Sequence, residues 1–299
     1  MKRKILISSM LALTVCSNLY AKENYVELGL GVINSKDSFS TEGSSTIDSV
    51  NSSASSESTT VPAVEFYYGV DISKNEQIYM ESQRGEFNFG YSQATNVGLF
   101  DVGFIYKLDE ESWQNPFSTG TSREKTDVSE KGAFISYGTS FSPIWKSNFV
   151  YRYTTVDYEN ETVIDALKRE GNRQQFLFKN QINSYVLNLN LEQYDADGDE
   201  SSYKQYEVEA EKSFKLSEKI SLFTLAGVGF KEYDETNSIL NKQIDATSYK
   251  AVAKLKYEKP FEVQNSYISF KMGVENEDAN HDFYDKENNF ALVGFGYRF

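Results

Sequence analysis

The sequence predicts an all-β fold, a transmembrane antiparallel up-and-down β-barrel with long extracellular loops and short periplasmic turns. Three observations predict it: a secretion signal at the N-terminus, strands that alternate apolar and polar residues, and an aromatic residue at the C-terminal end. No segment approaches 18 uninterrupted apolar residues, so membrane-spanning helices are excluded. The 21 Tyr and 21 Phe, beside only four Pro, are too many aromatics for a disordered secreted chain.

The first 21 residues have the layout of a secretory signal peptide. Lys2, Arg3 and Lys4 precede an apolar run, and the small residue Ala21 follows it. The run is too short to span a bilayer as a helix. We expect cleavage after Ala21, which leaves residues 22–299 as one barrel domain; a lipoprotein signal centred on Cys16 is a weaker alternative.

Removal of the signal changes the composition in two ways. Cys16 is the only cysteine, so the mature chain is expected to have no disulfide and no thiolate metal site. The three basic residues also leave, and 27 basic against 44 acidic side chains remain, a net charge of −17. Such an acidic chain is a poor partner for nucleic acid. We expect no cofactor, no metal site and no catalytic residues.

The first expected strand covers residues 24–33, where Val26, Leu28 and Leu30 share one face and Glu27 the other. The Ser-rich residues 34–60 cannot bury enough apolar area to fold alone, so they are expected to form a long loop. Residues 63–72 and 77–83 alternate again around a short turn. A long loop, a strand, a short turn and a second strand form the repeating pattern of a barrel.

The alternation is clearest in the second half of the chain. Expected strands cover residues 148–158, 185–194, 203–214, 220–233, 246–258, 265–277 and 288–299. Their connections alternate between long acidic segments and compact ones, as outer loops and periplasmic turns do. Nine strands from about residue 131 and four before residue 109 give an odd number. One weak strand is therefore expected within residues 111–130, for a total of 14, or 12 if two segments merge.

The last residues carry a resemblance to a known family. The chain closes on "FGYRF", in which Phe295, Tyr297 and Phe299 lie on one face. Together with the signal and the alternating strands, this end resembles the bacterial outer-membrane β-barrel proteins. The resemblance implies location in the outer membrane, contact with its lipid and lipopolysaccharide, and recognition of the last strand by the barrel-assembly machinery. A secreted β-sandwich or adhesin is the soluble alternative, because strand alternation alone does not exclude it.

Charged residues on the polar faces of the strands are the candidate lumen lining. Glu207, Glu209 and Glu211 share one side of a strand, and Lys250, Lys254 and Lys256 share one side of the next strand but one. The remaining candidates are Arg152, Lys179, Glu192, Lys231, Lys271, Glu275 and Arg298. These residues either fill a narrow lumen as a salt-bridged lining or set a field across an aqueous pore. The mixed signs predict no strong ion selectivity.

Two loop segments suggest further structure. Residues 160–171 are the one credible helix of the mature chain, with Thr162 and Asp165 as a capping box and Gly171 after its end. This helix is expected either to lie over the barrel mouth or to fold inward as a constriction. Asp195, Asp197 and Asp199 match the start of an EF-hand loop, but Glu200 and Tyr206 break the pattern. A solvated acidic loop is the expected structure there.

His281 is the only histidine, and it is surrounded by Asp278, Asp282 and Asp285. Outer-membrane protease and phospholipase barrels use a histidine with acidic or polar partners, so a hydrolase is one hypothesis. No second motif supports it, and a surface loop position is the simpler interpretation. The leading hypothesis is a porin-like channel for passive diffusion of small solutes through a mixed-charge lumen. A non-conducting surface barrel for adhesion, envelope integrity or partner binding is the alternative.

Overall fold

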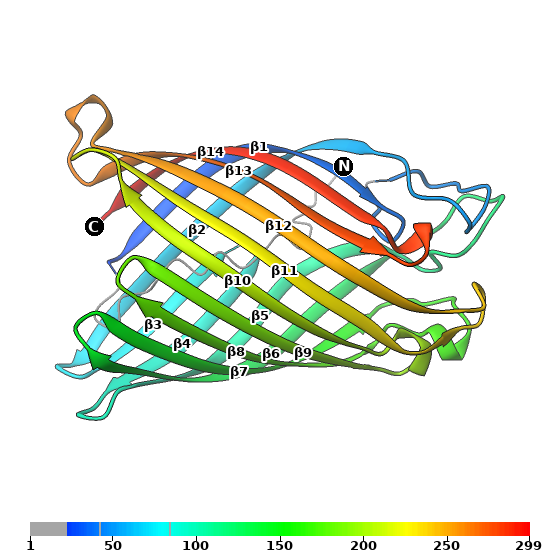
Figure 1. The fold of residues 1–299 in the computed structure, drawn as a ribbon, viewed down its shortest axis with the longest axis horizontal. Coiled ribbons are helices and arrows are strands. Elements are labelled where there is room, and N and C mark those ends of the chain that lie inside the picture. Colours follow the sequence, from blue (N-terminus) through cyan, green and yellow to red (C-terminus); the bar gives the residue numbers. More distant parts are fainter. Residues whose placement is uncertain (1–22, 42, 84) are drawn as a thin grey trace.

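The computed structural model describes residues 23–41, 43–83 and 85–299, and the described strands close into one antiparallel barrel of 14 strands (Figure 1). The predicted fold class and the preferred strand number are both confirmed. The strands are β1 (Tyr25–Asp37), β2 (Glu57–Ser73), β3 (Glu76–Gln83), β4 (Glu86–Ala94), β5 (Leu99–Trp113), β6 (Lys125–Ser142), β7 (Trp145–Tyr158), β8 (Gly171–Ile182), β9 (Tyr185–Ala196), β10 (Tyr203–Lys215), β11 (Ile220–Asn237), β12 (Lys242–Glu258), β13 (Ser266–Ala279) and β14 (Lys286–Arg298).

Each strand pairs with its neighbours along the chain, and β1 closes the barrel against β14. Tyr25 lies opposite Arg298, and the ladder continues without a break to Asp37 opposite Lys286. Closure gives every strand two partners, so the sheet has no free edge along its paired length.

The period of two in the sequence decides which side chains face outward. On β1, Leu28 and Leu30 are 58% and 65% exposed, whereas Glu27 between β14 and β2 is 8% exposed. The same alternation continues on β14, where Val293, Phe295 and Tyr297 are exposed. A belt of apolar side chains therefore surrounds the barrel, and charged side chains at the alternate positions, such as Glu27, lie on its inner face.

The two ends of the barrel differ in their connections. The turn end carries the C-terminus and six connections, and the loop end carries residues 38–56, 114–124, 159–170, 197–202, 238–241 and 280–285. The loops between β11 and β12 and between β13 and β14 are shorter than the sequence suggests. These four strands extend into hydrophilic segments whose composition is typical of loops. The connection between β3 and β4 at the loop end is also short.

Two sequence expectations are wrong. Residues 111–130 contain no weak strand: they hold the end of β5, a loop and the start of β6, and the additional strand lies before Trp113. The expected helix over residues 160–171 is a single 3₁₀ turn, Asp165–Leu167, without a side-chain cap. Its residues instead make contacts at the loop end, and these contacts override a weak helical preference.

The expected signal peptide, residues 1–21, and Cys16 within it lie outside the described residues. Within the described ranges, no helix has the length and apolar character needed to cross a membrane.

Candidate functional site

The acidic row of β10 and the basic row of β12 meet across the strand between them. Lys250 Nζ contacts the carboxylate of Glu207 and lies 2.5 Å from Glu209 Oε1. In the register, Gly227 of β11 stands directly between Glu209 and Lys250. A Cβ on Gly227 would lie 2.9 Å from Lys250 Cε. Because glycine has no side chain, Lys250 has room to reach Glu209 across β11.

Glu211 continues the acidic row toward the turn end. Its carboxylate lies 3.7 Å from Lys179 Nζ of β8 and accepts a hydrogen bond of 2.6 Å from Asn188 Nδ2. Asn188 also donates to Glu209 at 2.9 Å, so one amide links two carboxylates of the row. Glu207, Glu209, Glu211, Lys179 and Lys250 therefore form one connected group on the inner face.

A second charged group joins the closing strands. Lys254 Nζ lies 3.2 Å from Glu27 Oε2 of β1 and 3.6 Å from Glu65 Oε2 of β2. Lys271 of β13 stands opposite Lys254 in the register and is 4.0 Å from Glu65. Two lysines in direct opposition repel each other. Glu27 and Glu65, brought alongside by barrel closure, offset that repulsion.

The remaining candidates belong to smaller pairs. Arg298 donates two hydrogen bonds of 2.9 Å to Glu258, and Lys256 is 3.4 Å from the same carboxylate. Lys231 lies 2.7 Å from Glu277. Arg152 lies 2.5 Å from Glu86, and Glu192 lies 3.4 Å from Arg173. Glu275 of β13 stands opposite Lys250 of β12 in the strand register.

Several partners in these pairs were not among the sequence candidates: Glu27, Glu65, Glu86, Arg173, Glu258 and Glu277. Each lies at an inner position of its strand, so the same alternation rule applied to every charged residue would have found them. The pairing itself has no sequence signal, because partners such as Glu27 and Lys254 are 227 residues apart.

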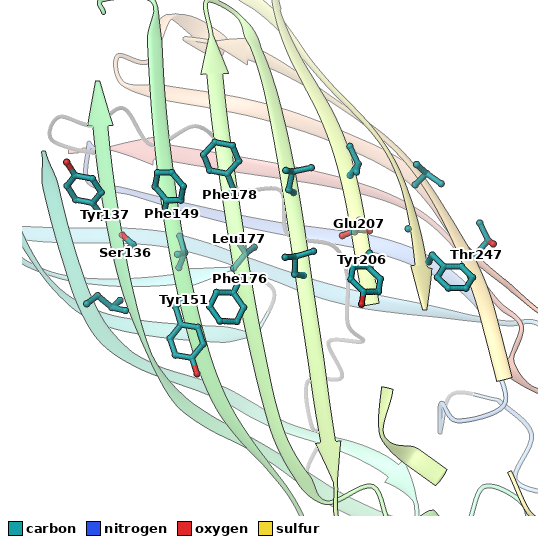
Figure 2. Close-up of a pocket in the computed structure, with 18 of the residues that line it drawn as sticks. Ser136, Tyr137, Phe149, Tyr151, Phe176, Leu177, Phe178, Tyr206, Glu207 and Thr247 are labelled. Atoms are coloured by element: carbon teal, nitrogen blue, oxygen red, sulfur yellow. The ribbon is translucent and has the colours of Figure 1, made fainter. Parts of the chain in front are cut away.

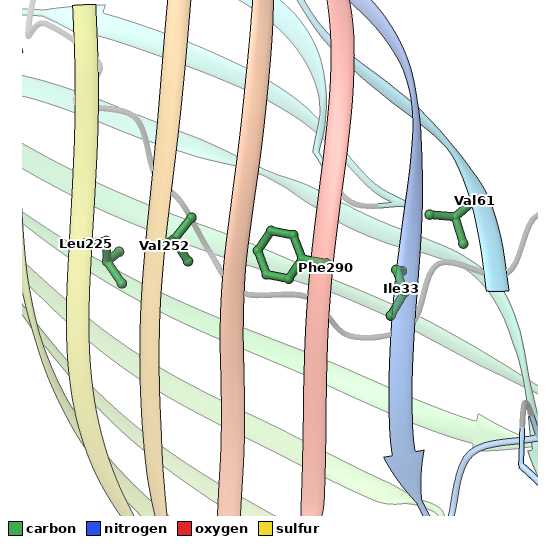
Figure 3. Packing of buried hydrophobic residues seen from close by; sticks show 5 residues of the cluster. All are labelled: Ile33, Val61, Leu225, Val252 and Phe290. Atoms are coloured by element: carbon green, nitrogen blue, oxygen red, sulfur yellow. The ribbon is translucent and has the colours of Figure 1, made fainter. Parts of the chain in front are cut away.

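An apolar cluster interrupts the charged inner face, and the sequence interpretation did not predict it. Ile33, Val61, Leu225, Val252 and Phe290 come from five strands and are at most 5% exposed (Figure 3). The row from Leu225 through Val252 to Phe290 and Ile33 lies between the Lys250 row and the Lys254 row. The inner face is therefore banded rather than uniformly charged.

A second apolar cluster, which we call the cap, joins the loops at the loop end. Its buried members are Phe117, Leu167, Ile244, Phe283 and Tyr284, and Phe39 packs against them. The rings of Phe117 and Phe283 stack with centroids 5.1 Å apart, and Phe39 lies 5.5 Å from Phe283. Burial raises the pKa of Tyr284 to about 12, so its hydroxyl stays protonated at neutral pH. These loops converge into one packed unit.

Arg123 fastens the cap to the barrel rim. Its guanidinium donates hydrogen bonds to the carbonyl oxygens of Ser38 at 2.8 Å, Pro116 at 3.1 Å and Ser44 at 2.5 Å. It also stacks on the ring of Trp113 at 4.4 Å. Burial lowers the pKa of Arg123 to about 10, which leaves it charged at neutral pH. One cation thus holds two loops against β5.

The outer face of the wall has a shallow apolar groove of about 720 Å³ that crosses strands β5 to β12. Aromatic side chains of neighbouring strands, among them Tyr137, Phe149, Tyr151, Phe176 and Phe178, lie side by side along it (Figure 2). Phe149 and Phe178 stack at 4.7 Å. Such a surface suits contact with hydrocarbon chains rather than with water.

The other sequence candidates, His281 and Asp199, lie at 3₁₀ turns of the loop end. His281 Nδ1 accepts a hydrogen bond from the backbone N–H of Phe283 at 3.2 Å, so it begins the turn that places Phe283 in the cap. Asp199 begins a 3₁₀ turn, Asp199–Ser201. Within the described ranges, no three His, Cys, Asp or Glu side chains are grouped as metal ligands would be.

The predicted assembly signal lies on the outer face of β14. Phe295, Tyr297 and Phe299 are 50%, 41% and 62% exposed. The backbone N–H of Phe299 donates to Asn24 O at 3.0 Å, which ties the last residue to the beginning of β1. Both ends of the described chain therefore meet at the seam where the barrel closes.

If the barrel-assembly machinery recognises the terminal aromatic, as the resemblance implies, deletion of Phe299 is expected to reduce the amount of heat-modifiable barrel in the outer membrane of cells. Refolding of the same variant from urea into detergent should remain close to wild type, since the loss removes one backbone hydrogen bond. Tyr68→Ala, which removes a ring stacked on Phe299, is the matched control. Equal losses in cells and in detergent would contradict a recognition role.

Comparison with solved structures places this architecture among known barrels. A Pseudomonas aeruginosa FadL homologue matches with a TM-score of 0.53 and 9% identity, over 93% of this chain and 91% of that chain. The CymD monoaromatic hydrocarbon channel matches at 0.50 and 8%, over 94% and 89%. A deltaS2 mutant of the TodX monoaromatic hydrocarbon channel matches at 0.50 and 10%, over 94% and 91%. At such identities the likeness establishes a shared fold.

Sequence comparison adds a family but no activity. No curated protein matches the chain. Residues 23–298 match the family described as "Protein of unknown function (DUF2860)", and this range covers almost the whole sequence. The chain is a member of the DUF2860 family.

Proposed function

We propose that this protein is a channel of the bacterial outer membrane that passes small solutes through a mixed-charge lumen. The observation that supports this most is the division of the wall, which carries exposed apolar side chains outside and ion-paired side chains inside. A closed barrel with this division fits a bilayer, because every strand has its backbone hydrogen bonds and its apolar face meets lipid. The fold shared with known hydrocarbon channels agrees with this proposal.

The pairing of the inner charges predicts modest selectivity. Lys250, Lys254 and Arg298 each contact a carboxylate, so the field along the lumen alternates in sign over short distances. A strongly selective pore needs a ring of one sign. We therefore expect passage of both cations and anions, with a weak preference at most.

The cap bears on how solutes enter. The cap joins the β5–β6 and β13–β14 loops, which come from opposite sides of the strand ring, so we infer that it restricts an axial path. Conduction would then require either a gap beside the cap or its displacement. The same observation favours the alternative function, a non-conducting barrel whose loops bind a partner at the cell surface. Recording in planar bilayers separates the two: discrete conductance steps support the channel, and a silent barrel that inserts normally supports the surface role.

Reversal of charge on the inner face gives a direct test of the lumen. Lys254→Glu with Lys256→Glu is expected to shift the reversal potential in a salt gradient toward cations, because it replaces two positive charges beside Glu27 and Glu258 with negative ones. The matched control is Lys204→Glu with Lys212→Glu on β10, at the alternate positions to Glu207 and Glu209. Equal shifts of the reversal potential in both variants would show that Lys254 and Lys256 do not line the conduction path.

A further inference from the structure

The connection between β12 and β13 is unlike the others at the turn end. It comprises residues 259–265, seven residues, whereas the remaining described turns at this end have two to four. In Figure 1 it is the orange turn that stands away from the side of the barrel, near the C-terminus. Two antiparallel neighbouring strands can be joined by a turn of two residues, so the additional length is not required for the connection itself.

The backbone of this turn is held in an unusual conformation. Lys259, Phe261, Glu262 and Asn265 all have positive φ, between 52° and 60°, although none is glycine. Residues with side chains adopt this conformation at a cost in free energy, and they keep it only where surrounding contacts fix it.

The surrounding contacts are present. The N–H of Lys259 donates to Ser266 O at 2.8 Å, and the N–H of Arg298 donates to Asn265 O at 2.9 Å, which fixes both ends of the turn to the barrel. Glu262 Oε1 lies 2.6 Å from Lys219 Nζ of the adjacent turn. The projection is therefore a built element whose tip is presented in one orientation.

The tip presents apolar side chains. Phe261 is 89% exposed, the largest exposed fraction among the exposed large hydrophobic residues of the described chain, and Val263 is 48% exposed. Leaving a phenyl ring in water forgoes the free energy of its burial. Lys259 stands beside these residues, while the charge of Glu262 is balanced by Lys219. An apolar tip next to a lysine matches a phospholipid surface, which offers acyl chains below anionic phosphates.

We propose that the turn of residues 259–265 is a membrane-interface anchor. It places Phe261 and Val263 among the headgroups of the leaflet that faces the turn end, with Lys259 at the phosphates. This inference rests on the proposed outer-membrane location. The sideways projection of the turn supports a lipid rather than a soluble partner, because a turn that leaves the barrel wall laterally lies over the bilayer surface.

Fluorescence quenching by brominated phospholipids tests the anchor. The parent is Trp145→Phe, in which Trp113, at the loop end, is the remaining tryptophan; the test variant adds Phe261→Trp. Both are refolded into phosphatidylcholine vesicles that carry bromine near the headgroup or near the chain end. The emission added by the Phe261→Trp substitution is expected to be lost with bromine near the headgroup and retained more with deep bromine, since interfacial side chains sit roughly 5–10 Å into the boundary.

Two comparisons make the result decisive. Glu235→Trp in the same parent, at an exposed loop-end position, is expected to keep its emission in all vesicles. Trp145 of the wild type, exposed on the outer face and packed on Phe141 at 4.9 Å, is expected to be quenched. If Trp145 is quenched and the indole introduced by Phe261→Trp is not, the anchor is wrong while the membrane location stands. If neither is quenched, both are wrong. Val263→Trp provides the same measurement should Phe261→Trp fail to fold.

Discussion

Arg123→Ala is expected to loosen the cap and to increase the conductance of the barrel. The guanidinium donates to three carbonyl oxygens from two loops and stacks on Trp113, and the substitution leaves those oxygens without this donor. Hydrogen bonds to a charged group contribute about 1.5–3 kcal/mol each, so the cap should lose at least about 2 kcal/mol. Faster proteolysis within residues 38–56 and more frequent open events in planar bilayers are the measurements.

Lys125→Ala is the matched control for this prediction. Lys125 belongs to the neighbouring strand end and lies 5.9 Å from the Trp113 ring, but it is 46% exposed and pairs with Glu111 at the surface. Exposed pairs contribute about 1 kcal/mol or less. Proteolysis and conductance should therefore stay close to wild type. Equal behaviour of the two variants would show that Arg123 is not what fastens the cap.

A disulfide at the rim should produce the opposite effect. Ser40 forms an isolated antiparallel bridge with Ser112 of β5, so cysteines at these positions lie within reach of a bond. In a Cys16→Ser background, oxidised Ser40→Cys with Ser112→Cys is expected to suppress open events, and reduction should restore them. The control pair, Thr139→Cys with Ser147→Cys, joins residues already opposed on β6 and β7. Suppression in both pairs alike would count against movement of the cap.

Lys250→Met is expected to destabilise the barrel by about 3 kcal/mol. Lys250 is 8% exposed and contacts both Glu207 and Glu209, and its removal leaves two carboxylates near each other without that cation. Removal of one partner from a buried ion pair typically costs about 3–5 kcal/mol. The midpoint of urea unfolding in detergent micelles, followed by heat-modifiable migration, measures the change.

The triple variant Glu207→Gln, Glu209→Gln and Lys250→Met separates charge from packing. Neutral amides no longer need the lysine, so most of the lost stability should return. If Lys250→Met alone leaves the midpoint unchanged, water rather than the ion pair solvates these carboxylates.

The sequence by itself determined the strands and their two faces. Alternation is a local property, because successive side chains of a strand point to opposite sides whatever the strand pairs with. The faces of residues 24–33 and 288–299 could therefore be read directly, and so could the apolar row ending in Phe299. Strand number followed from counting such segments, although the count misplaced one strand into residues 111–130, where polar residues of β5 and β6 continue past the apolar belt.

Only the tertiary structure decided which residues meet. Glu27 contacts Lys254 because β1 closes on β14, and Lys250 reaches Glu209 because Gly227 lies between them. The cap and the band from Leu225 to Ile33 gather side chains from separate loops and strands. The expected helix over residues 160–171 gave way to such contacts: Leu167 is buried in the cap, and Arg169 binds Glu161 at 2.6 Å. Pairings of this kind depend on closure and register, which no local pattern encodes.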